Sequence, residues 1–308
     1  VKGVLGPTMQ LQQVGKWSLS GNGTHADISA MGGKWAVAFQ DKTATQEQLK
    51  VVSSATPAAP EIVAKGNQAG RLPAIQLLPN DKLAVAHQFK EKLISKSTGQ
   101  VIVLGPGLVF EKSHDVSSTT GGGLDNQLSL NTSVNPPLLL YGSIAIRSST
   151  EFLGHVATAP LNTLTFVGKD FPGGNVKTEL GIDLDGLNMV MARKTSGPDA
   201  TIGYWGANAT KAETIPGLSK VAQPRIAHRN GLSAVVTIDA TLTTKLRFTV
   251  RDDTSNTWTS PLELPKGGYV QVIATPGPSN DTVFHVLWRG SDNPKKITHQ
   301  PIRCARTK

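Results

Sequence analysis

Three arginines and four aromatic residues in the second half of the sequence have side chains suited to a polar ligand with an apolar face. They are Arg193, Arg247 and Arg289, with Tyr204, Trp205, Trp258 and Tyr269. A guanidinium group donates several hydrogen bonds in a fixed plane, and an aromatic ring stacks on the C–H face of a sugar. The sequence therefore predicts carbohydrate-binding sites made from these seven residues.

Each tryptophan also has a second interpretation, which is packing between sheets. Trp205 is the strongest candidate for an accessible ring, because it lies in Gly203-Tyr204-Trp205-Gly206. The glycines on both sides of this pair have no side chains that could cover the rings. We therefore expect a small number of sites in the region of Arg193 to Arg289, with the loop between Ser113 and Asn126 as the alternative location.

Other kinds of chemistry find little support in the sequence. Cys304 is the only cysteine, which excludes an internal disulfide and Cys-rich metal sites. The histidines are dispersed, and the sequence contains no nucleophile elbow, phosphate loop or calcium loop. We therefore expect no cofactor and no bound metal, and we expect dispersed, hydrogen-bonded histidines.

The net charge of +9 could favour an anionic partner, but the Lys and Arg residues are scattered and no nucleic-acid-binding motif occurs. No apolar run reaches about 18 residues, so we expect no membrane span. Four glycosylation sequons begin at Asn22, Asn131, Asn208 and Asn280. They matter only if the chain is secreted. We expect a secreted or extracellular protein, with the cytoplasm as the alternative, and glycans or glycoproteins as its partners.

Six short apolar runs recur along the chain, each after a turn rich in Gly, Asp or Asn. Their first residues are 45 to 54 apart, a period close to the ~40–50 residues of a four-stranded propeller blade. The runs are Ala36–Phe39, Ala84–His87, Leu138–Tyr141, Met189–Ala192, Ala234–Thr237 and Phe284–Leu287. Continuous apolar runs are typical of strands buried on both faces, and we interpret these six as blade anchors.

Further strands are expected around each anchor. A hairpin joins the anchor to the strand before it, with Asp185-Gly186 and Arg229-Asn230-Gly231 as the clearest turns. A third strand follows, and a fourth is expected at Val101–Leu104, Leu164–Val167 and Trp258–Leu264. A β-sandwich pair is the alternative, but six evenly spaced anchors favour an all-β, six-bladed propeller.

The stretch Gly15–Gly21 resembles the last strand of a cluster, at Asn256–Leu262, but it stands at the start of the chain. The final cluster ends at Ile302 without such a strand. A first strand that completes the last blade would close the ring and remove two sheet edges. We therefore expect residues 1–308 to form one domain that is closed by residues 15–21.

The segment Arg251–Trp258 resembles the Asp-box of sialidase-type propellers, Ser-x-Asp-x-Gly-x-Thr-Trp. Asp253 and Thr257-Trp258 fit the box, whereas Arg251 and Ser255 replace its Ser and Gly. The resemblance implies a catalytic role for Tyr269 and Glu179, and a carboxylate-binding role for Arg193 and Arg247. The first blade departs from this family: it has Ala26-Asp27-Ile28-Ser29 where sialidases have an arginine and an acid/base aspartate, and Arg71-Leu72-Pro73 lies in the second blade.

The repeats are also similar to those of fungal six-bladed fucose-binding lectins of the Aleuria type. Leu246-Arg247-Phe248-Thr249, followed by Trp258, resembles one repeat of that family. This resemblance implies sugar binding between blades and no catalysis. From the sequence we therefore expect a lectin, and the alternatives are a sialidase-like glycoside hydrolase with an altered site and a propeller that binds proteins.

Overall fold

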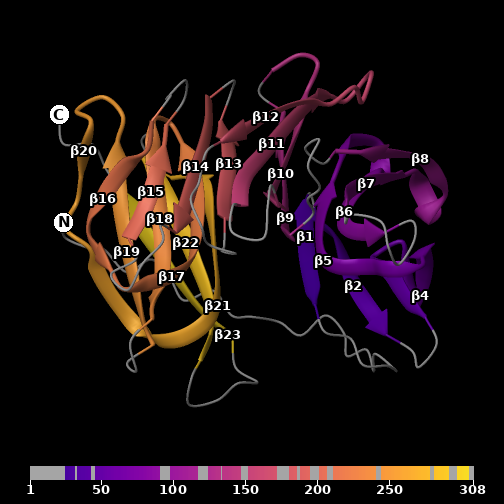
Figure 1. Ribbon diagram of the computed structural model, residues 1–308, viewed down its shortest axis with the longest axis horizontal. Helices are drawn as coiled ribbons and strands as arrows, with labels where there is room; N and C mark the ends of the chain where they lie inside the picture. Colours follow the sequence, from indigo (N-terminus) through magenta and orange to yellow (C-terminus); the bar gives the residue numbers. More distant parts are fainter. Residues whose placement is uncertain are drawn as a thin grey trace. The chain divides into compact units, whose positions relative to one another are not determined.

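The computed structural model describes the chain as two compact units, each a set of antiparallel β-sheets (Figure 1). The first unit holds the described residues from His25 to Phe171, and the second those from Leu180 to Cys304. The described residues are 25–31, 33–42, 46–90, 98–116, 124–132, 134–146, 152–171, 180–185, 188–194, 201–206, 211–240, 244–277, 281–290 and 297–304.

The first unit contains three four-stranded sheets. Their strands, in chain order, are β1 (Ala26–Met31), β2 (Lys34–Lys42), β3 (Glu47–Ser53) and β4 (Thr56–Lys65); β5 (Asn67–Leu77), β6 (Leu83–Lys90), β7 (Thr98–Leu104) and β8 (Phe110–Asp115); and β9 (Leu124–Asn131), β10 (Leu138–Ile146), β11 (Phe152–Pro160) and β12 (Val167–Phe171). Two short 3₁₀ turns connect strands of the second sheet: η1 (Pro79–Asp81) lies between β5 and β6, and η2 (Pro106–Leu108) lies between β7 and β8.

The second unit begins with a four-stranded sheet and continues with two sheets that share one long strand. Its strands are β13 (Leu180–Asp185), β14 (Asn188–Lys194), β15 (Thr201–Trp205), β16 (Glu213–Ser219), β17 (Val221–Arg229), β18 (Leu232–Asp239), β19 (Lys245–Asp252), β20 (Thr257–Trp258), β21 (Leu262–Pro276), β22 (Thr282–Gly290) and β23 (Ile297–Cys304). The first part of β21 pairs with β19 and its second part with β22, so the chain passes directly from one sheet to the next.

All six apolar anchors lie in the second strand of a sheet, as the sequence predicts: β2, β6, β10, β14, β18 and β22. A second strand has a neighbouring strand on both sides, so both of its edges are paired. β18 shows the result most clearly, since every residue from Leu232 to Asp239 is buried. These central strands supply the buried clusters of each unit, including Leu139 with Tyr141 and Phe284 with Val286.

Two strand assignments from the sequence are wrong. Of the expected fourth strand Leu164–Val167, only Val167 lies in a strand, β12. Val101–Leu104 belongs to β7, which pairs with β6 and is the third strand of its sheet. The fourth strand is β8, whose residues are almost all exposed and polar. A solvated edge strand lacks the apolar pattern by which strands are recognised. The expected loop Ser113–Asn126 is also shorter, because β8 continues to Asp115 and β9 begins at Leu124.

Carboxylates of the first strands link neighbouring sheets within each unit. Asp27 Oδ2 in β1 accepts a hydrogen bond from the Ile75 amide in β5, at 2.9 Å. In the second unit, Asp183 Oδ2 in β13 accepts one from the His228 amide in β17, at 2.7 Å. The carboxylate of Asp27, in the first blade, therefore accepts a backbone hydrogen bond from the neighbouring sheet.

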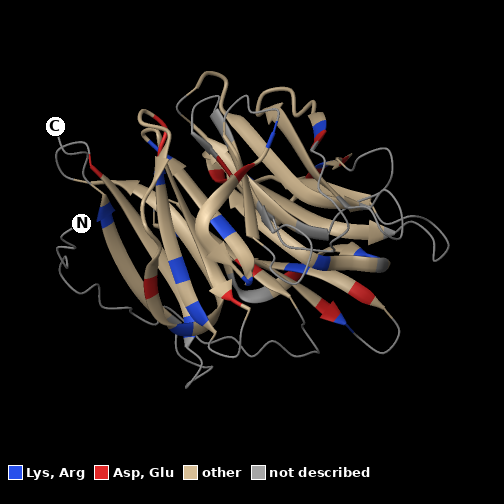
Figure 2. Cartoon of the chain, turned by 60° about the vertical axis from the view of Figure 1, so that its left-hand side comes forward, with Lys and Arg blue, Asp and Glu red and all other residues tan. Residues whose placement is uncertain are grey.

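Residues 15–21, the expected closing strand, lie outside the described residues, and the single-domain expectation stays a prediction. Lys and Arg residues are spread over many strands, with Asp and Glu residues scattered among them (Figure 2). Within the described part of the chain, no helix is long and apolar enough to span a membrane.

Candidate functional site

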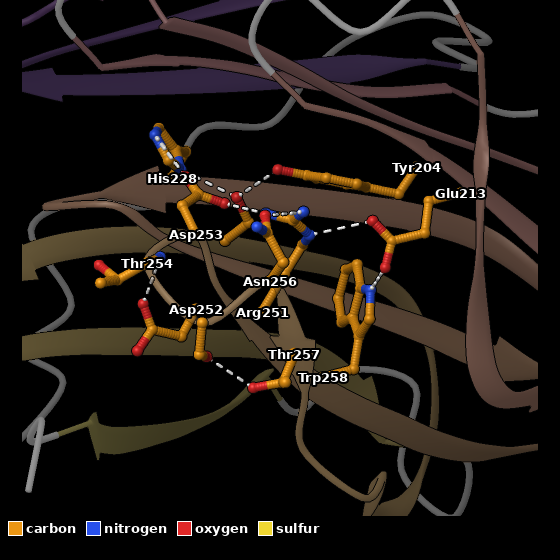
Figure 3. Close-up of polar contacts among 12 residues, drawn as sticks. Tyr204, Glu213, His228, Arg251, Asp252, Asp253, Thr254, Asn256, Thr257 and Trp258 are labelled. Carbon is orange, nitrogen blue, oxygen red and sulfur yellow. Dashed lines mark hydrogen bonds and ion pairs between the residues drawn. The ribbon is translucent and has the colours of Figure 1, made fainter.

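The hairpin between β19 and β20 presents the Asp-box-like segment. Arg251 lies opposite Trp258, and Asp252 lies opposite Thr257. The turn between them is held by a hydrogen bond from the Thr254 amide to Asp252 Oδ1, at 2.9 Å. This short turn brings the ends of β19 and β20 together, so that Arg251 and Trp258 project side by side (Figure 3).

Glu213 reaches this hairpin from β16 of the preceding sheet. Its Oε1 accepts a hydrogen bond from the Trp258 indole N–H at 2.6 Å, and its Oε2 accepts one from Arg251 Nε at 3.1 Å (Figure 3). The Glu213 side chain remains 40% exposed, whereas that of Arg251 is 12% exposed. One carboxylate therefore joins two sheets and still faces solvent.

The remaining nitrogens of Arg251 also have partners. Nη1 pairs with Asp253, and Nη2 donates to Asn256 Oδ1 at 2.8 Å. The guanidinium lies over the Tyr204 ring at 5.1 Å, and the Trp258 ring meets Tyr204 edge-on at the same centroid distance. Glu213, Arg251, Asp253, Asn256 and Trp258 form what we call the Glu213 cluster.

Two buried hydroxyls and a buried histidine lie against this cluster. The Tyr204 and Ser233 hydroxyls are 2.9 Å apart, and Ser233 Oγ is 2.8 Å from His228 Nδ1. His228 Nε2 lies 3.8 Å from Asp253 Oδ2 (Figure 3). Burial raises the pKa of Tyr204 to about 12, so its hydroxyl stays protonated at neutral pH. The ring of contacts from Arg251 through Tyr204 and back to Asp253 fixes the orientation of both charged groups.

The expectation of accessible rings at Tyr204 and Trp205 is wrong. Tyr204 is 1% exposed and Trp205 is 8% exposed. Both lie in β15, which has β14 on one side and β16 on the other. Because Gly203 has no side chain, the Trp205 ring packs close to its backbone; a Cβ on Gly203 would lie 3.1 Å from that ring. The flanking glycines therefore allow close packing instead of exposure.

The structure places the other predicted residues in different surroundings. Arg247 pairs with Asp239 Oδ2 at 3.3 Å and with Glu263 Oε1 at 3.7 Å. Arg289 lies over the Tyr269 ring at 4.4 Å, so these two come together away from the hairpin turn. The side chain of Arg193 and the whole of Glu179 lie outside the described residues.

Sequence reasoning missed Glu213, Asp253 and Asn256 as site residues and gave Arg251 no ligand role. The available signal was the departure from the Asp-box, where Arg251 replaces a serine. Glu213 gave no signal, because a lone acidic residue before Thr214 in a polar strand is typical of a solvated surface.

Six of the seven histidines are hydrogen-bonded, as expected, whereas the buried Nε2 of His114 has no hydrogen-bond partner among the residues that the structure describes. His87 is fully buried, and desolvation lowers its pKa to about 4. His155 pairs with Asp170 at 2.6 Å, and His285 Nδ1 lies 3.0 Å from His299 Nε2. Among the described side chains, no three of His, Cys, Asp or Glu lie close enough together to hold a metal ion.

Comparison with solved structures shows the β-propeller fold. The chain is similar to the lectin of Aleuria aurantia, described as a six-bladed β-propeller, with 11% identity and a TM-score of 0.55 over 91% of this chain and 93% of that one. It is equally similar to an N10 neuraminidase-like protein of influenza A from the little yellow-shouldered bat, with 8% identity and a TM-score of 0.55 over 92% and 95%.

A protein of unknown function from Dyadobacter fermentans gives 12% identity and a TM-score of 0.55 over 92% of this chain and 95% of that one. No family model and no curated protein matches the sequence. At these identities the likeness concerns the fold alone, and the residues of the site have to carry the functional argument.

Proposed function

We propose that this protein is a lectin: it binds glycans without hydrolysing them, and the Glu213 cluster is its binding site. The observation that carries the proposal is the exposed carboxylate of Glu213, fixed between Arg251 and the indole of Trp258. Sugar recognition needs oriented hydrogen-bonding groups beside an aromatic ring, and this cluster supplies both.

Each group of the cluster has a separate task in this proposal. The free lone pairs of Glu213 and Asp253 accept hydrogen bonds from sugar hydroxyls. Arg251 Nη1 and Nη2 each carry a second N–H that donates to a hydroxyl or ring oxygen. The half-buried ring of Trp258 covers the C–H face of the sugar. Preorganisation by Tyr204 reduces the ordering cost of binding.

The charges of the cluster favour a neutral sugar. One guanidinium faces two carboxylates, Glu213 and Asp253, so an acidic sugar would meet carboxylate repulsion without an unpaired cation in compensation. The similarity in fold to the Aleuria aurantia lectin agrees with glycan binding.

A sialidase-like hydrolase is the weaker alternative. Glycoside hydrolysis needs two catalytic groups on opposite sides of one bond. Asp27, the first-blade carboxylate, bonds to the Ile75 amide instead. Turnover of aryl glycosides or aryl sialosides that disappears in Tyr269→Phe would favour the hydrolase over the lectin.

The test is a glycan array, followed by calorimetry with the neutral glycan that binds best. Glu213→Gln keeps the shape of the side chain but removes the charge, and we expect a loss of affinity of about ten- to a hundred-fold. Glu61→Gln, which changes an exposed glutamate of β4 in the other unit, is the matched control. Unchanged affinity in both Glu213→Gln and Trp258→Ala, with both variants folded, would place the site elsewhere.

A further inference from the structure

Tyr269 is exposed in an unusual way for a strand residue. It lies at the irregularity in the pairing of β21 with β22, between Gly268 and Gln271. Its φ of 53° is in the left-handed region, and its side chain is 69% exposed. Non-glycine residues in this region cost of order 1 kcal/mol, and such strain concentrates at functional sites. The backbone therefore holds a large ring out into solvent at an energetic cost.

Arg289 supports this ring and leaves its own donors available. Its guanidinium lies 4.4 Å from the centre of the Tyr269 ring. In the described part of the chain, no carboxylate pairs with Arg289, although it is exposed at the end of β22. Stacking fixes the plane of the guanidinium without using its N–H groups, so the plane is set for bidentate recognition of an oxyanion.

The surroundings of Arg289 carry an excess of positive charge. Lys266 is exposed, has no acidic partner among the described residues, and lies directly opposite Lys245 on the neighbouring strand. Lys245 pairs with Glu263 at 2.7 Å. Glu263 compensates Lys245, whereas Lys266 and Arg289 have no carboxylate partner within the described residues. We call Lys266, Tyr269 and Arg289 the Tyr269 patch.

The two glycines that precede Tyr269 differ in their packing: Gly267 is closely packed, and Gly268 has open space beside it. A Cβ on Gly267 would lie 2.2 Å from Trp288 Cδ1, so the backbone here is pressed against a buried tryptophan. A Cβ on Gly268 would meet nothing within 4 Å, although Gly268 lies opposite Arg289 in the sheet. The patch is therefore anchored on one side and open on the other.

We propose that the Tyr269 patch is a second binding site, which takes sugars that carry a sulfate or a carboxylate. Arg289 donates paired hydrogen bonds to the oxyanion, Lys266 adds charge, and the exposed ring of Tyr269 stacks on the sugar. The shared chemistry is an oxyanion on a pyranose ring. This site goes beyond the neutral-sugar site at the Glu213 cluster and does not depend on it.

The test is calorimetry at low ionic strength with three probes: a heparin-derived oligosaccharide, a hyaluronan-derived oligosaccharide and inorganic sulfate. The first two separate sulfate from carboxylate recognition, and inorganic sulfate measures the contribution of the anion alone. We expect binding of at least one oligosaccharide to weaken about ten- to a hundred-fold in Arg289→Gln, because charged hydrogen bonds are lost. Tyr269→Ala should lose about ten-fold, whereas Tyr269→Phe should keep wild-type affinity.

Lys112→Gln is the matched control, since it removes one positive charge from the exposed strand β8. An equal loss of affinity in Lys112→Gln and Arg289→Gln would show that only net charge matters and would overturn the proposal. Wild-type affinity in Arg289→Gln would also overturn it, as would the absence of binding to every oligosaccharide. Arg251→Ala should leave acidic-sugar binding intact, so this proposal and that of the Glu213 cluster can fail separately.

Discussion

Arg251 and Arg289 both lie over a tyrosine ring, at 5.1 Å and 4.4 Å, but the two pairs differ in burial and in charge. Tyr204 is 1% exposed and Tyr269 is 69% exposed. Arg251 contacts Glu213 and Asp253, whereas Arg289 has no carboxylate partner within the described residues. The same pairing can therefore either fix a carboxylate for a neutral ligand or leave a guanidinium free for an anionic one.

The position of each pair in the sheets explains this difference. Arg251 is opposite Trp258 in a hairpin that Glu213 reaches from a neighbouring sheet, so the protein itself supplies the acceptors. Arg289 is at the end of β22, where β21 has just crossed from one sheet to the next. Glu263 of β21 pairs with Lys245 and Arg247, and no carboxylate of the described residues pairs with Arg289, so a ligand has to supply its acceptor.

The largest effect is expected from deleting residues 1–21. This deletion tests whether the last blade, which carries Arg289, has as many strands as the sheet that carries Tyr204. The sheet of Tyr204 has four strands, whereas β22, which carries Arg289, follows β21 and is followed in the described chain only by β23, at the end of a seven-stranded sheet. We propose that residues 15–21 add the missing strand beside β23. The deletion should then cause insolubility or a large drop in Tm, because it exposes a sheet edge. A truncated protein as stable as the full chain in calorimetric melting would refute ring closure.

The next effect is expected from Gly267→Ala, which disturbs the base of the Tyr269 patch alone. Its Cβ would clash with Trp288 and would lie 2.6 Å from the Arg289 carbonyl oxygen. We expect a loss of about 3 kcal/mol in the free energy of unfolding, measured in urea. Gly268→Ala is the matched control and should change stability by less than about 1 kcal/mol. Equal stabilities for the two variants would contradict the packing described for this crossing.

A smaller effect is expected on the pH dependence of stability, through ionisation of the buried Tyr204 hydroxyl. Because burial raises the pKa of Tyr204 to about 12, the folded protein keeps a proton that the unfolded chain loses near pH 10. The folded state binds more protons in this window, so stability falls as pH rises from about 10 to about 12.

Tyr204→Phe should reduce this fall, as measured by urea unfolding at pH 8 and pH 10.5. Tyr269→Phe is the matched control, because it removes the same hydroxyl from an exposed ring. If Tyr204→Phe loses as much stability between pH 8 and pH 10.5 as the wild type does, the Tyr204 hydroxyl is not buried beneath the cluster as described.

The fold could be predicted from the sequence because buried central strands have a clear pattern. Each apolar anchor occupies the second strand of its sheet, which has a neighbouring strand on both sides. Edge strands such as β8 escaped recognition, because Phe110–Asp115 is exposed and carries charged residues. The glycines beside Trp205 also led to a wrong prediction of an exposed ring, because in the folded chain they allow the ring to pack closely and be buried.

The candidate site was predicted only in part, because it combines residues from two sheets. Trp258 and Tyr204 were named from the sequence, but Glu213 is 45 residues from Trp258, the residue to which it bonds. No sequence spacing indicates such a contact, which depends on how β16 lies against the β19–β20 hairpin. Tyr269 and Arg289 were both named, and their stacking depends on the irregular pairing of β21 with β22.

The most direct test of the account is a crossed binding measurement with one neutral and one acidic glycan. Calorimetry would compare the wild type with Glu213→Gln and Arg289→Gln. We expect Glu213→Gln to weaken only the neutral glycan and Arg289→Gln to weaken only the acidic one, each by about ten-fold or more. Equal losses for both glycans in either variant, or no loss in both variants, would contradict two chemically distinct sites.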